Sequence, residues 1–447
     1  MKKYDIVLEY IEKLYNSNQI HVGEKLPSIR NLSAHLNVNK STIIRAYEIL
    51  IEQHKAYVIP KSGYYWLQRQ PDLATVSKLI DFTKLHPDPD LLPYKEFEHC
   101  IGQAINIYKT ELFNYGSIQG LPSLLKALKI HFSKRQIHTN EECIYITSGS
   151  QQALSLLCDL SMYPYDVNQK GLIVEQPSYS LIQKLPHYKN ITMVGVSRNK
   201  NGLNLKALEQ LFKSKKYKFF YTIPRCHNPL GTDLSEKEKL KIVELAHKYK
   251  MYIIEDDFVA DLTVKEKQLP LHYYDTHDRV IYVKSFSKAF LPGIRLGALV
   301  LPKSLISDFS IFKRMHDLNT SVLSQGALEL YLTSGLYDKH TKKAKKYYNK
   351  KHQIILNLLN QINLKDVEVI IPESGFLSYI EFKNNFPFEL FMQLASNRGL
   401  KINPINDFFI SSNTTPKAIR LCYAALSEEE IKKGLLILIE ILKKLSP

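Results

Sequence analysis

The sequence predicts an α/β protein in two parts: a small N-terminal winged helix-turn-helix and a large domain with a mostly parallel sheet flanked by helices. In the first 70 residues, apolar side chains recur at helical spacing and a hairpin pattern follows. From about residue 80 onward, helical patterns alternate with short apolar strands, which is typical of parallel sheets. A length of 447 residues allows two or three domains. We therefore expect domains at residues 1–70 and 80–447, joined by a linker at 71–79.

Composition excludes several classes of protein. Apolar residues make up 45% and charged residues 23%, which is ordinary for a globular chain. The five cysteines are scattered without a C-x-x-C pair, so we expect reduced thiols and no metal module. No apolar run reaches the roughly 18 residues of a membrane span, and acids interrupt the N-terminus. The chain is expected to be cytoplasmic, with no membrane partner, and its net charge of +16 is compatible with a polyanionic partner.

The N-terminal region has the element order of a winged helix-turn-helix. Apolar residues at helical spacing predict a first helix, and a proline before the second helix prevents a helical approach from upstream. The expected elements are a helix over 6–14, a helix from Ser28, a helix capped by Asn39 or Ser41, and strands over 57–59 and 64–67.

The second and third helices carry a polar set that suits DNA. Hydroxyls and amides at a helix N-terminus favour phosphate contacts, and the start of the third helix would lie in the major groove. The alternative is a small helical bundle used for protein contacts. The candidate DNA-binding residues are Ser28, Arg30, Asn39, Lys40, Ser41, Thr42, Arg45 and, in the wing, Lys61.

In the large domain, chemically useful residues follow the expected strands. Parallel strands bring the segments after them to one edge of the sheet. The strands are expected at 143–147, 171–175, 219–223, 252–255 and 280–283. After the first comes the small-residue turn Gly149–Ser150–Gln151, an anion cradle, and after the second comes Tyr179.

The remaining strands are followed by an amide, an acid cluster and a lysine. Asn228 is fixed by a following proline, and the three acids at 255–257 require a cationic partner or a metal. Lys288 is flanked by Ser285, Ser287 and, seven residues on, Arg295. Burial and nearby positive charge would lower the pKa of this amine and allow it to attack a carbonyl.

Two resemblances follow from these motifs. The stretch Gly23–Arg30 (GEKLPSIR), continued by Leu32, Leu36, Val38, Thr42 and Ala46–Tyr47, resembles the GntR-family DNA-binding head. The ordered set after the strands resembles fold-type I pyridoxal-phosphate enzymes, the aspartate aminotransferase superfamily, across residues 80–447. That resemblance implies a smaller C-terminal subdomain and pyridoxal 5'-phosphate as the cofactor.

The resemblance also implies roles for individual residues. The implied roles are Lys288 as the internal aldimine, Asp256 as the partner of the pyridinium nitrogen, Asn228 as donor to the phenolic oxygen, Tyr179 as the stacking ring, and Gly149, Ser150, Gln151, Ser285, Ser287 and Arg295 as the phosphate-binding set. Tyr115 resembles the tyrosine that reaches the coenzyme phosphate of the neighbouring subunit, and Arg420 the arginine that binds a substrate carboxylate.

A head and body of these kinds together resemble the MocR/GabR group of bacterial transcriptional regulators. The resemblance implies a head-to-tail homodimer that binds double-stranded operator DNA and senses pyridoxal phosphate or an amino compound. The group's usual tyrosine two residues after the aspartate is Phe258 here, so turnover should be weak. An arginine that the GABA-responsive members carry is replaced by Leu181, which argues against GABA. The alternatives are an active aminotransferase with a DNA-binding appendage and a body that is only a dimerisation scaffold.

Overall fold

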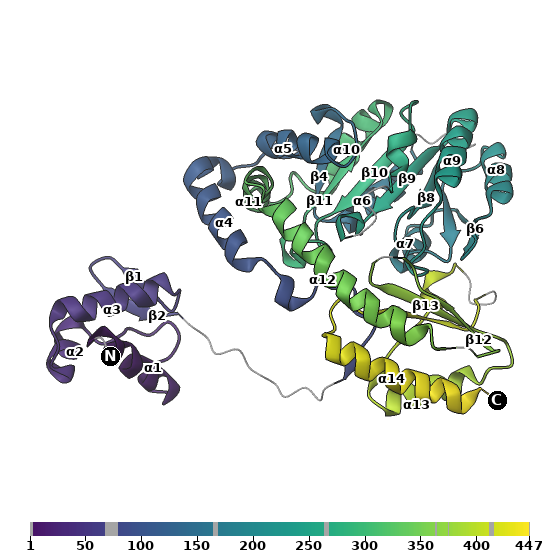
Figure 1. Ribbon diagram of the computed structural model, residues 1–447. Coiled ribbons are helices and arrows are strands. Elements are labelled where there is room, and N and C mark those ends of the chain that lie inside the picture. The colour runs from purple at the N-terminus through teal and green to yellow at the C-terminus, as the bar shows by residue number, and fades with distance from the viewer. Residues whose placement is uncertain are drawn as a thin grey trace. The chain divides into compact units, whose positions relative to one another are not determined.

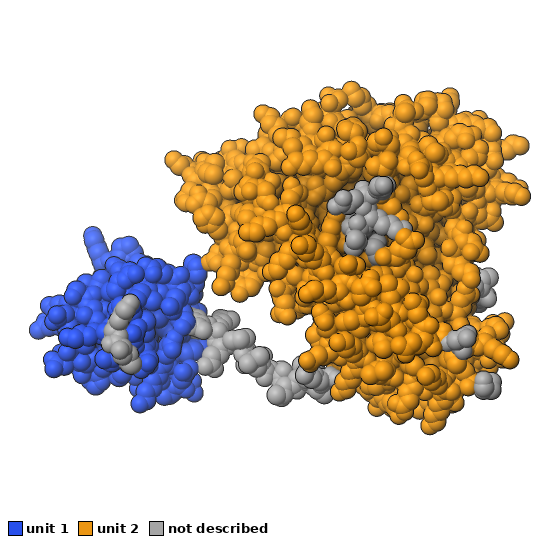
Figure 2. All heavy atoms as spheres, in the orientation of Figure 1, with its two compact units in different colours: residues 1–77 blue, residues 78–447 orange. Residues whose placement is uncertain are grey.

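The computed structural model describes residues 3–67, 79–163, 169–262, 268–362, 364–373, 375–410 and 415–446. The chain forms two compact units, residues 1–77 and 78–447, which are coloured separately in Figure 2. Apart from Leu79, the linker expected at 71–79 lies outside the described residues.

The first unit contains three helices followed by a hairpin, as the sequence predicts. The elements are α1 Lys3–Asn16, α2 Ile29–Leu36, α3 Lys40–Glu52, β1 Ala56–Ile59 and β2 Gly63–Trp66. Val7, Ile11, Ile43 and Leu50 lie at the centre of its apolar core, which Trp66 closes from the hairpin. The winged helix-turn-helix order is therefore confirmed.

The second unit is built on an eight-stranded sheet (Figure 1). The strands lie in the order β4 Ile144–Thr147, β11 Gly297–Val300, β10 Val280–Ser285, β9 Tyr252–Asp257, β8 Phe219–Thr222, β5 Leu172–Gln176, β6 Met193–Asn199 and β7 Gly202–Leu203. Only β11 and β7 run against the common direction. The sheet is mostly parallel, as expected.

Helices cover both faces of this sheet, because successive strand residues point to opposite sides. Two neighbouring residues of β5 illustrate this: Leu172 packs into one apolar cluster and Ile173 into another. One face is covered by α6 Ser150–Leu160, α7 Ser180–Tyr188, α10 Ile306–His316 and part of α12 Leu336–Leu359. The other is covered by α4 Tyr94–Tyr108, α5 Pro122–Ser133, α8 Leu205–Lys213, α9 Glu236–Tyr249 and α11 Val322–Thr333.

A smaller C-terminal subdomain follows α12, as the fold-type resemblance implies. Its antiparallel sheet has the order β12 Val367–Ile370, β13 Leu377–Phe382, β16 Ala418–Cys422 and β15 Asn403–Pro404, with α13 Phe388–Asn397 and α14 Glu428–Leu445 beside it (Figure 1). A separate short pair joins β3 Ile80–Asp81 to β14 Leu400–Lys401 in parallel. This pair fixes the start of the second unit to its C-terminal subdomain.

Among the described residues, no helix is long and apolar enough to cross a lipid bilayer.

Candidate functional site

The candidate site lies where the parallel strands β4, β5, β8, β9 and β10 end. The side chains expected from sequence follow these strands, so the sheet collects them at one edge. The antiparallel strand β11 adds to this arrangement. Because β10 and β11 form a hairpin, the loop between them stays at the same edge and carries both Lys288 and Arg295.

Lys288 occupies a half-buried position and points to a backbone carbonyl. Its Nζ donates a hydrogen bond to the carbonyl oxygen of Leu85 at 2.8 Å. Burial is the main cause that lowers the pKa of Lys288, and the nearby cations Arg295 and Arg420 act in the same direction. A lowered pKa increases the share of the neutral amine, which is the form that a nucleophile requires.

Asp256 is buried and has one carboxylate oxygen without a partner in the described part of the chain. Its Oδ2 accepts a hydrogen bond from the Tyr221 hydroxyl at 2.7 Å, whereas Oδ1 has no hydrogen-bond partner. Burial raises the pKa of Asp256 to about 7. A buried acceptor of this kind is satisfied by a cationic N–H donor, such as a protonated pyridine nitrogen.

The two acids beside Asp256 are held by other groups of the chain. Glu255 accepts hydrogen bonds from the backbone N–H groups of Leu271 and His272, at 2.7 and 2.8 Å. Asp257 forms a buried ion pair with Arg225, which supplies the cationic partner that the acid cluster requires. The described residues contain no group of three or more His, Cys, Asp or Glu placed to hold a metal ion.

The N-terminus of α6 forms a tight cradle with Arg295. Gly149 has φ +82°, and a Cβ there would lie 3.1 Å from Arg295 Nη2. A Cβ on Gly297 would lie 2.8 Å from the Gly149 carbonyl carbon, so the two backbones touch. Arg295 Nη2 lies 3.5 Å from both Ser148 O and Gln151 Oε1. Backbone N–H groups and a guanidinium converge here, as an anion site requires.

The two serines before Lys288 are both buried. Ser285 Oγ accepts a hydrogen bond from the backbone N–H of Ser287 at 3.3 Å. Ser287 Oγ has no partner among the described residues, so its hydroxyl is available as a hydrogen-bond donor.

Tyr179 and Asn228 stand on the other side of the site. The Tyr179 hydroxyl accepts a hydrogen bond from Gln151 Nε2 at 3.3 Å, which links this ring to the cradle. Asn228 Oδ1 accepts from Arg420 Nη1 at 3.1 Å. This contact fixes the orientation of the Asn228 amide. Its Nδ2, which can only donate, points the other way and is available to an acceptor.

Arg420 is buried without a carboxylate partner in the described part of the chain. Its Nη2 donates to the carbonyl oxygen of Thr83 at 2.7 Å, and its Nε has no partner among described atoms. The guanidinium also lies over the Phe408 ring, 5.1 Å from the centroid. Burial lowers the pKa of Arg420, and a carboxylate ligand would offset this cost of desolvation.

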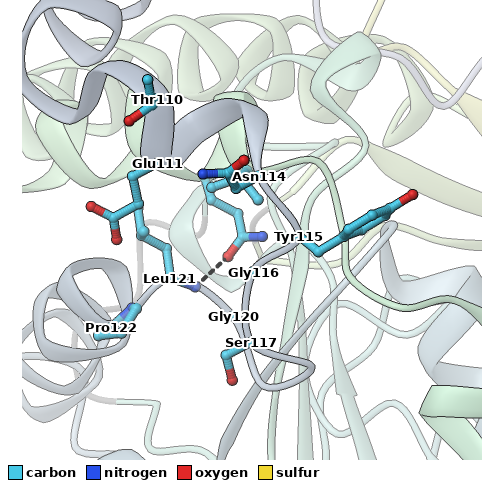
Figure 3. A pocket seen from close by; sticks show the side chains of 11 residues that line it. Thr110, Glu111, Asn114, Tyr115, Gly116, Ser117, Gly120, Leu121 and Pro122 are labelled. Atoms are coloured by element: carbon cyan, nitrogen blue, oxygen red, sulfur yellow. Dashed lines mark hydrogen bonds between the residues drawn. The ribbon is translucent and has the colours of Figure 1, made fainter.

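Tyr115 is not brought together with these residues within one chain. It is 86% exposed and lines a surface pocket of about 360 Å³ with Asn114, Gln325 and others. Figure 3 shows its ring pointing away from the other labelled side chains. An exposed ring of this size suits the predicted role at a neighbouring subunit's site, which stays a prediction.

Sequence reasoning missed a buried ionic network beneath the site. Glu175 accepts from Arg198 Nη1 at 2.7 Å, from the Thr222 hydroxyl at 2.8 Å and from the Ile223 N–H at 3.0 Å. His227 Nε2 lies 3.2 Å from its other oxygen. The pKa of Glu175 falls to about 2 because Arg198 and the other donors outweigh its burial. Arg198 lies on the neighbouring strand β6, 23 residues along the chain, and no motif signals its contact with Glu175.

Three further contacts were also missed. Tyr221 lies within a strand that sequence reasoning treated only as apolar, and it binds Asp256. The carbonyls of Thr83 and Leu85 belong to a stretch without a clear period. Backbone acceptors have no signature in a sequence, so nothing could have indicated these two.

The candidate DNA-binding residues lie at helix starts and in the hairpin turn. Ser28 caps α2 by accepting the Asn31 N–H at 3.1 Å, and Asn39 occupies the cap position of α3. Lys61 lies in the β1–β2 turn with φ +64°. The exposed members of the set are Ser28, Arg30, Asn39, Lys40, Ser41, Arg45 and Lys61, and Thr42 is half-buried.

Arg45 is held along its own helix. Its Nη1 lies 3.1 Å from carboxylate oxygens of both Glu48 and Glu52. A phosphate or base edge would compete with these two exposed pairs, which are individually weak.

Comparison with known proteins identifies both units. Residues 3–65 match the family described as bacterial regulatory proteins, gntR family, and residues 94–437 match aminotransferase class I and II. An uncharacterized HTH-type transcriptional regulator of Bacillus subtilis, YcxD, is 37% identical over 98% of this chain and 99% of its own. The HTH-type transcriptional regulator NorG of Staphylococcus aureus is 27% identical, over 94% of this chain and 100% of its own.

A solved structure supports the fold of the body. Kynurenine aminotransferase of Pyrococcus horikoshii, crystallised with PMP and its substrates and products, superposes with a TM-score of 0.76. It is 25% identical, and the match covers 83% of this chain and 92% of that one.

Proposed function

Because this chain belongs to the family of HTH-type transcriptional regulators that join a gntR-family head to an aminotransferase class I and II body, we propose that its body binds pyridoxal 5'-phosphate and senses it, or an amino compound, to control DNA binding by the head. The observation that carries this proposal is the buried Asp256 Oδ1, which has no partner among the described atoms. A pyridinium N–H is a donor that satisfies it.

The other residues of the site fit the same coenzyme. Gly149, Ser150, Gln151, Ser285, Ser287 and Arg295 would hold its phosphate, Tyr179 would stack on its ring, and Asn228 would donate to its phenolic oxygen. The cradle is narrow and cationic, as a phosphate requires, and the buried Ser287 hydroxyl supplies a donor. Tyr115 of a second copy would complete the phosphate site in a head-to-tail homodimer.

The chain's own groups divide the work of binding. When bound, the coenzyme supplies an aldehyde and an electron-accepting ring. Lys288 Nζ provides a neutral amine to the aldehyde, and Asp256 keeps a proton on the ring nitrogen. Arg420 offers a buried guanidinium to a carboxylate of an amino compound. These roles select a ligand with an amine and a carboxylate, and Leu181 argues against GABA.

The head supplies the DNA contacts. Ser28, Asn39 and Lys40 at the starts of α2 and α3 would meet backbone phosphates, with Arg30, Ser41, Thr42 and Arg45 toward the groove and Lys61 in the wing. The partner is double-stranded operator DNA.

The test is an absorbance spectrum of the purified protein with pyridoxal phosphate, before and after borohydride. We expect a band near the visible edge that borohydride converts to a stable attachment on Lys288. Lys288→Ala is expected to lose the band. In the wild type, borohydride is expected to leave Lys284, a lysine on β10, without attached coenzyme. Absence of a band and of any saturable coenzyme binding would contradict the proposal.

A working aminotransferase with a DNA-binding appendage is the second candidate. The retention of Lys288, Asp256 and Arg420 favours it, and Phe258 argues against efficient turnover because it lacks a hydroxyl. Sustained conversion of an amino acid and keto acid pair would establish this candidate, whereas a half-reaction without turnover fits the sensor.

A further inference from the structure

The first segment of the second unit contacts Lys288 and Arg420, the two basic side chains that the proposed ligand would engage. We name residues 80–86 the joining segment, because they follow the residues that connect the two units in the sequence. Lys288 Nζ donates to its Leu85 carbonyl at 2.8 Å, and Arg420 Nη2 donates to its Thr83 carbonyl at 2.7 Å. The segment's inner half is therefore held by the amine and the guanidinium that the proposed ligand would engage.

The outer half of the joining segment is anchored elsewhere. Ile80 N–H donates to Gly399 O and Phe82 N–H donates to Lys401 O, both at 2.9 Å. Phe82 is fully buried, and a Cβ on Gly434 of α14 would lie 2.6 Å from its ring. These contacts involve none of the side chains that are proposed to touch the ligand.

A turn directs the inner carbonyls toward the site. Asp81 Oδ1 accepts the Thr83 N–H at 2.9 Å and the Thr83 hydroxyl at 2.6 Å. Burial acts to raise the pKa of Asp81, but the Thr83 hydrogen bonds and Lys401, whose Nζ lies 3.6 Å away, lower it overall. The turn is thus set by a residue that does not itself touch the site.

We propose that Lys288 and Arg420 restrain the joining segment in the coenzyme-free protein, and that a ligand releases it by taking these two donors. This inference rests on the proposed function. Pyridoxal phosphate bound at the site would engage the Lys288 amine, and a nitrogen engaged in this way would no longer be held by the Leu85 carbonyl. A carboxylate on Arg420 replaces the Thr83 carbonyl. Coenzyme alone releases one contact, and an added carboxylate releases the second.

The joining segment then carries ligand occupancy to the chain that leads to the head. Coupling of this kind requires a difference in contacts between the two states, and the two carbonyl bonds supply it. The loss of one such hydrogen bond corresponds to a change of about tenfold in a local opening equilibrium.

Hydrogen exchange of the full-length protein, read by mass spectrometry on peptides covering 80–86, tests the restraint. Without ligand, Lys288→Met and Arg420→Met are expected to speed exchange there about tenfold. Lys432→Met, an exposed lysine on α14, is the control and leaves the rate unchanged. Peptides from β12 and β13 report that the variants are folded. Wild-type exchange in folded Lys288→Met and Arg420→Met would overturn the inference.

Two probes test release in the wild-type protein. Pyridoxal phosphate is expected to speed exchange of the segment in the wild type and to add nothing in Lys288→Met. N-(5'-phosphopyridoxyl)-L-leucine, which presents a carboxylate, is expected to act through Arg420 and to have no effect in Arg420→Met. Saturation by both probes without any change at 80–86 contradicts release.

The readout on DNA uses a variant outside the site. Asp81→Asn weakens the turn at Thr83 without altering a coenzyme contact. This variant is expected to keep the absorbance band. The DNA probe is a sequence selected by binding to the full-length protein. The change in affinity for this DNA that pyridoxal phosphate causes is expected to fall by more than half. A full response would show that the signal bypasses the segment. If no band forms, the coenzyme proposal fails, while the ligand-free variants still decide the restraint.

Discussion

Two buried acids of the large sheet, Glu175 on β5 and Asp256 on β9, are satisfied in different ways. Glu175 accepts hydrogen bonds from Arg198, Thr222 and Ile223, and His227 Nε2 lies 3.2 Å from its Oε2. Asp256 receives one hydrogen bond and keeps an oxygen without a partner among the described residues. The pKa of Glu175 is lowered to about 2, whereas the pKa of Asp256 is raised to about 7. Both oxygens of Glu175 are bonded by its own chain, whereas Asp256 keeps one oxygen that a ligand donor would satisfy.

The largest expected effect is on stability, at Glu175. Glu175→Gln removes the charge opposite the fully buried Arg198, so we expect a loss of about 3–5 kcal/mol in the free energy of unfolding. Urea denaturation followed by circular dichroism measures it. Glu440→Gln, in an exposed pair with Arg398, is the matched control and should leave the midpoint unchanged. An equal midpoint for both variants would show that the buried pair of Glu175 contributes no more to stability than the exposed pair of Glu440.

Acid should weaken the same network. The folded pKa of Glu175 is depressed to about 2, so its contribution is present above its ordinary value of 4.5 and is lost as pH falls toward 2. His227, with its pKa lowered to about 4, acts in the same direction because the unfolded chain takes up the proton first. Between pH 7 and pH 3 the stability difference between wild type and Glu175→Gln should shrink. A difference in stability between the two proteins that stayed constant from pH 7 to pH 3 would contradict the pairing of Glu175 with Arg198.

Asp256→Asn should show the reverse pattern. Its raised pKa means that the ionised carboxylate costs stability as pH rises from its ordinary value through 7, so the coenzyme-free variant should unfold at the same or a higher temperature at pH 8. Coenzyme affinity should fall roughly 10- to 100-fold, because a charged hydrogen bond is lost. Thermal melts and absorbance titration measure the two effects. If Asp256→Asn unfolded at a lower temperature but bound coenzyme as tightly as the wild type, Asp256 would be a residue that stabilises the fold and not one that binds the coenzyme.

The smallest expected effect is at Phe258. Phe258→Tyr adds a hydroxyl at a buried ring beside the site, so we expect coenzyme affinity to rise by about two- to tenfold, the range of one neutral hydrogen bond. A spectrophotometric titration compares the two proteins. An unchanged titration would mean that the hydroxyl finds no partner on the ligand.

Sequence reasoning succeeded where a signal is local. Periodic apolar residues predicted the three helices and hairpin of the head, and β8 and β10 begin where the sequence indicates, at Phe219 and Val280. Small and polar residues after strands marked Gly149, Asp256 and Lys288, because a parallel sheet makes strand ends converge.

It failed where a contact joins distant segments. Arg198 reaches Glu175 across β5 and β6, and Lys288 reaches Leu85 across about two hundred residues. The antiparallel direction of β11 also has no local signal, because the apolar pattern of four residues, Gly297–Val300, does not indicate in which direction the strand runs. These features depend on tertiary packing, so they required coordinates.

The reversed strand β11 also has a consequence for how this site can vary. Because β10 and β11 are adjacent and antiparallel, the residues between Ser285 and Gly297 leave and return at one edge. A crossover helix would have carried the chain to the far edge before it could return. Lys288 and Arg295 therefore lie on one hairpin connection, so a change that shifts this hairpin moves the amine and the guanidinium together.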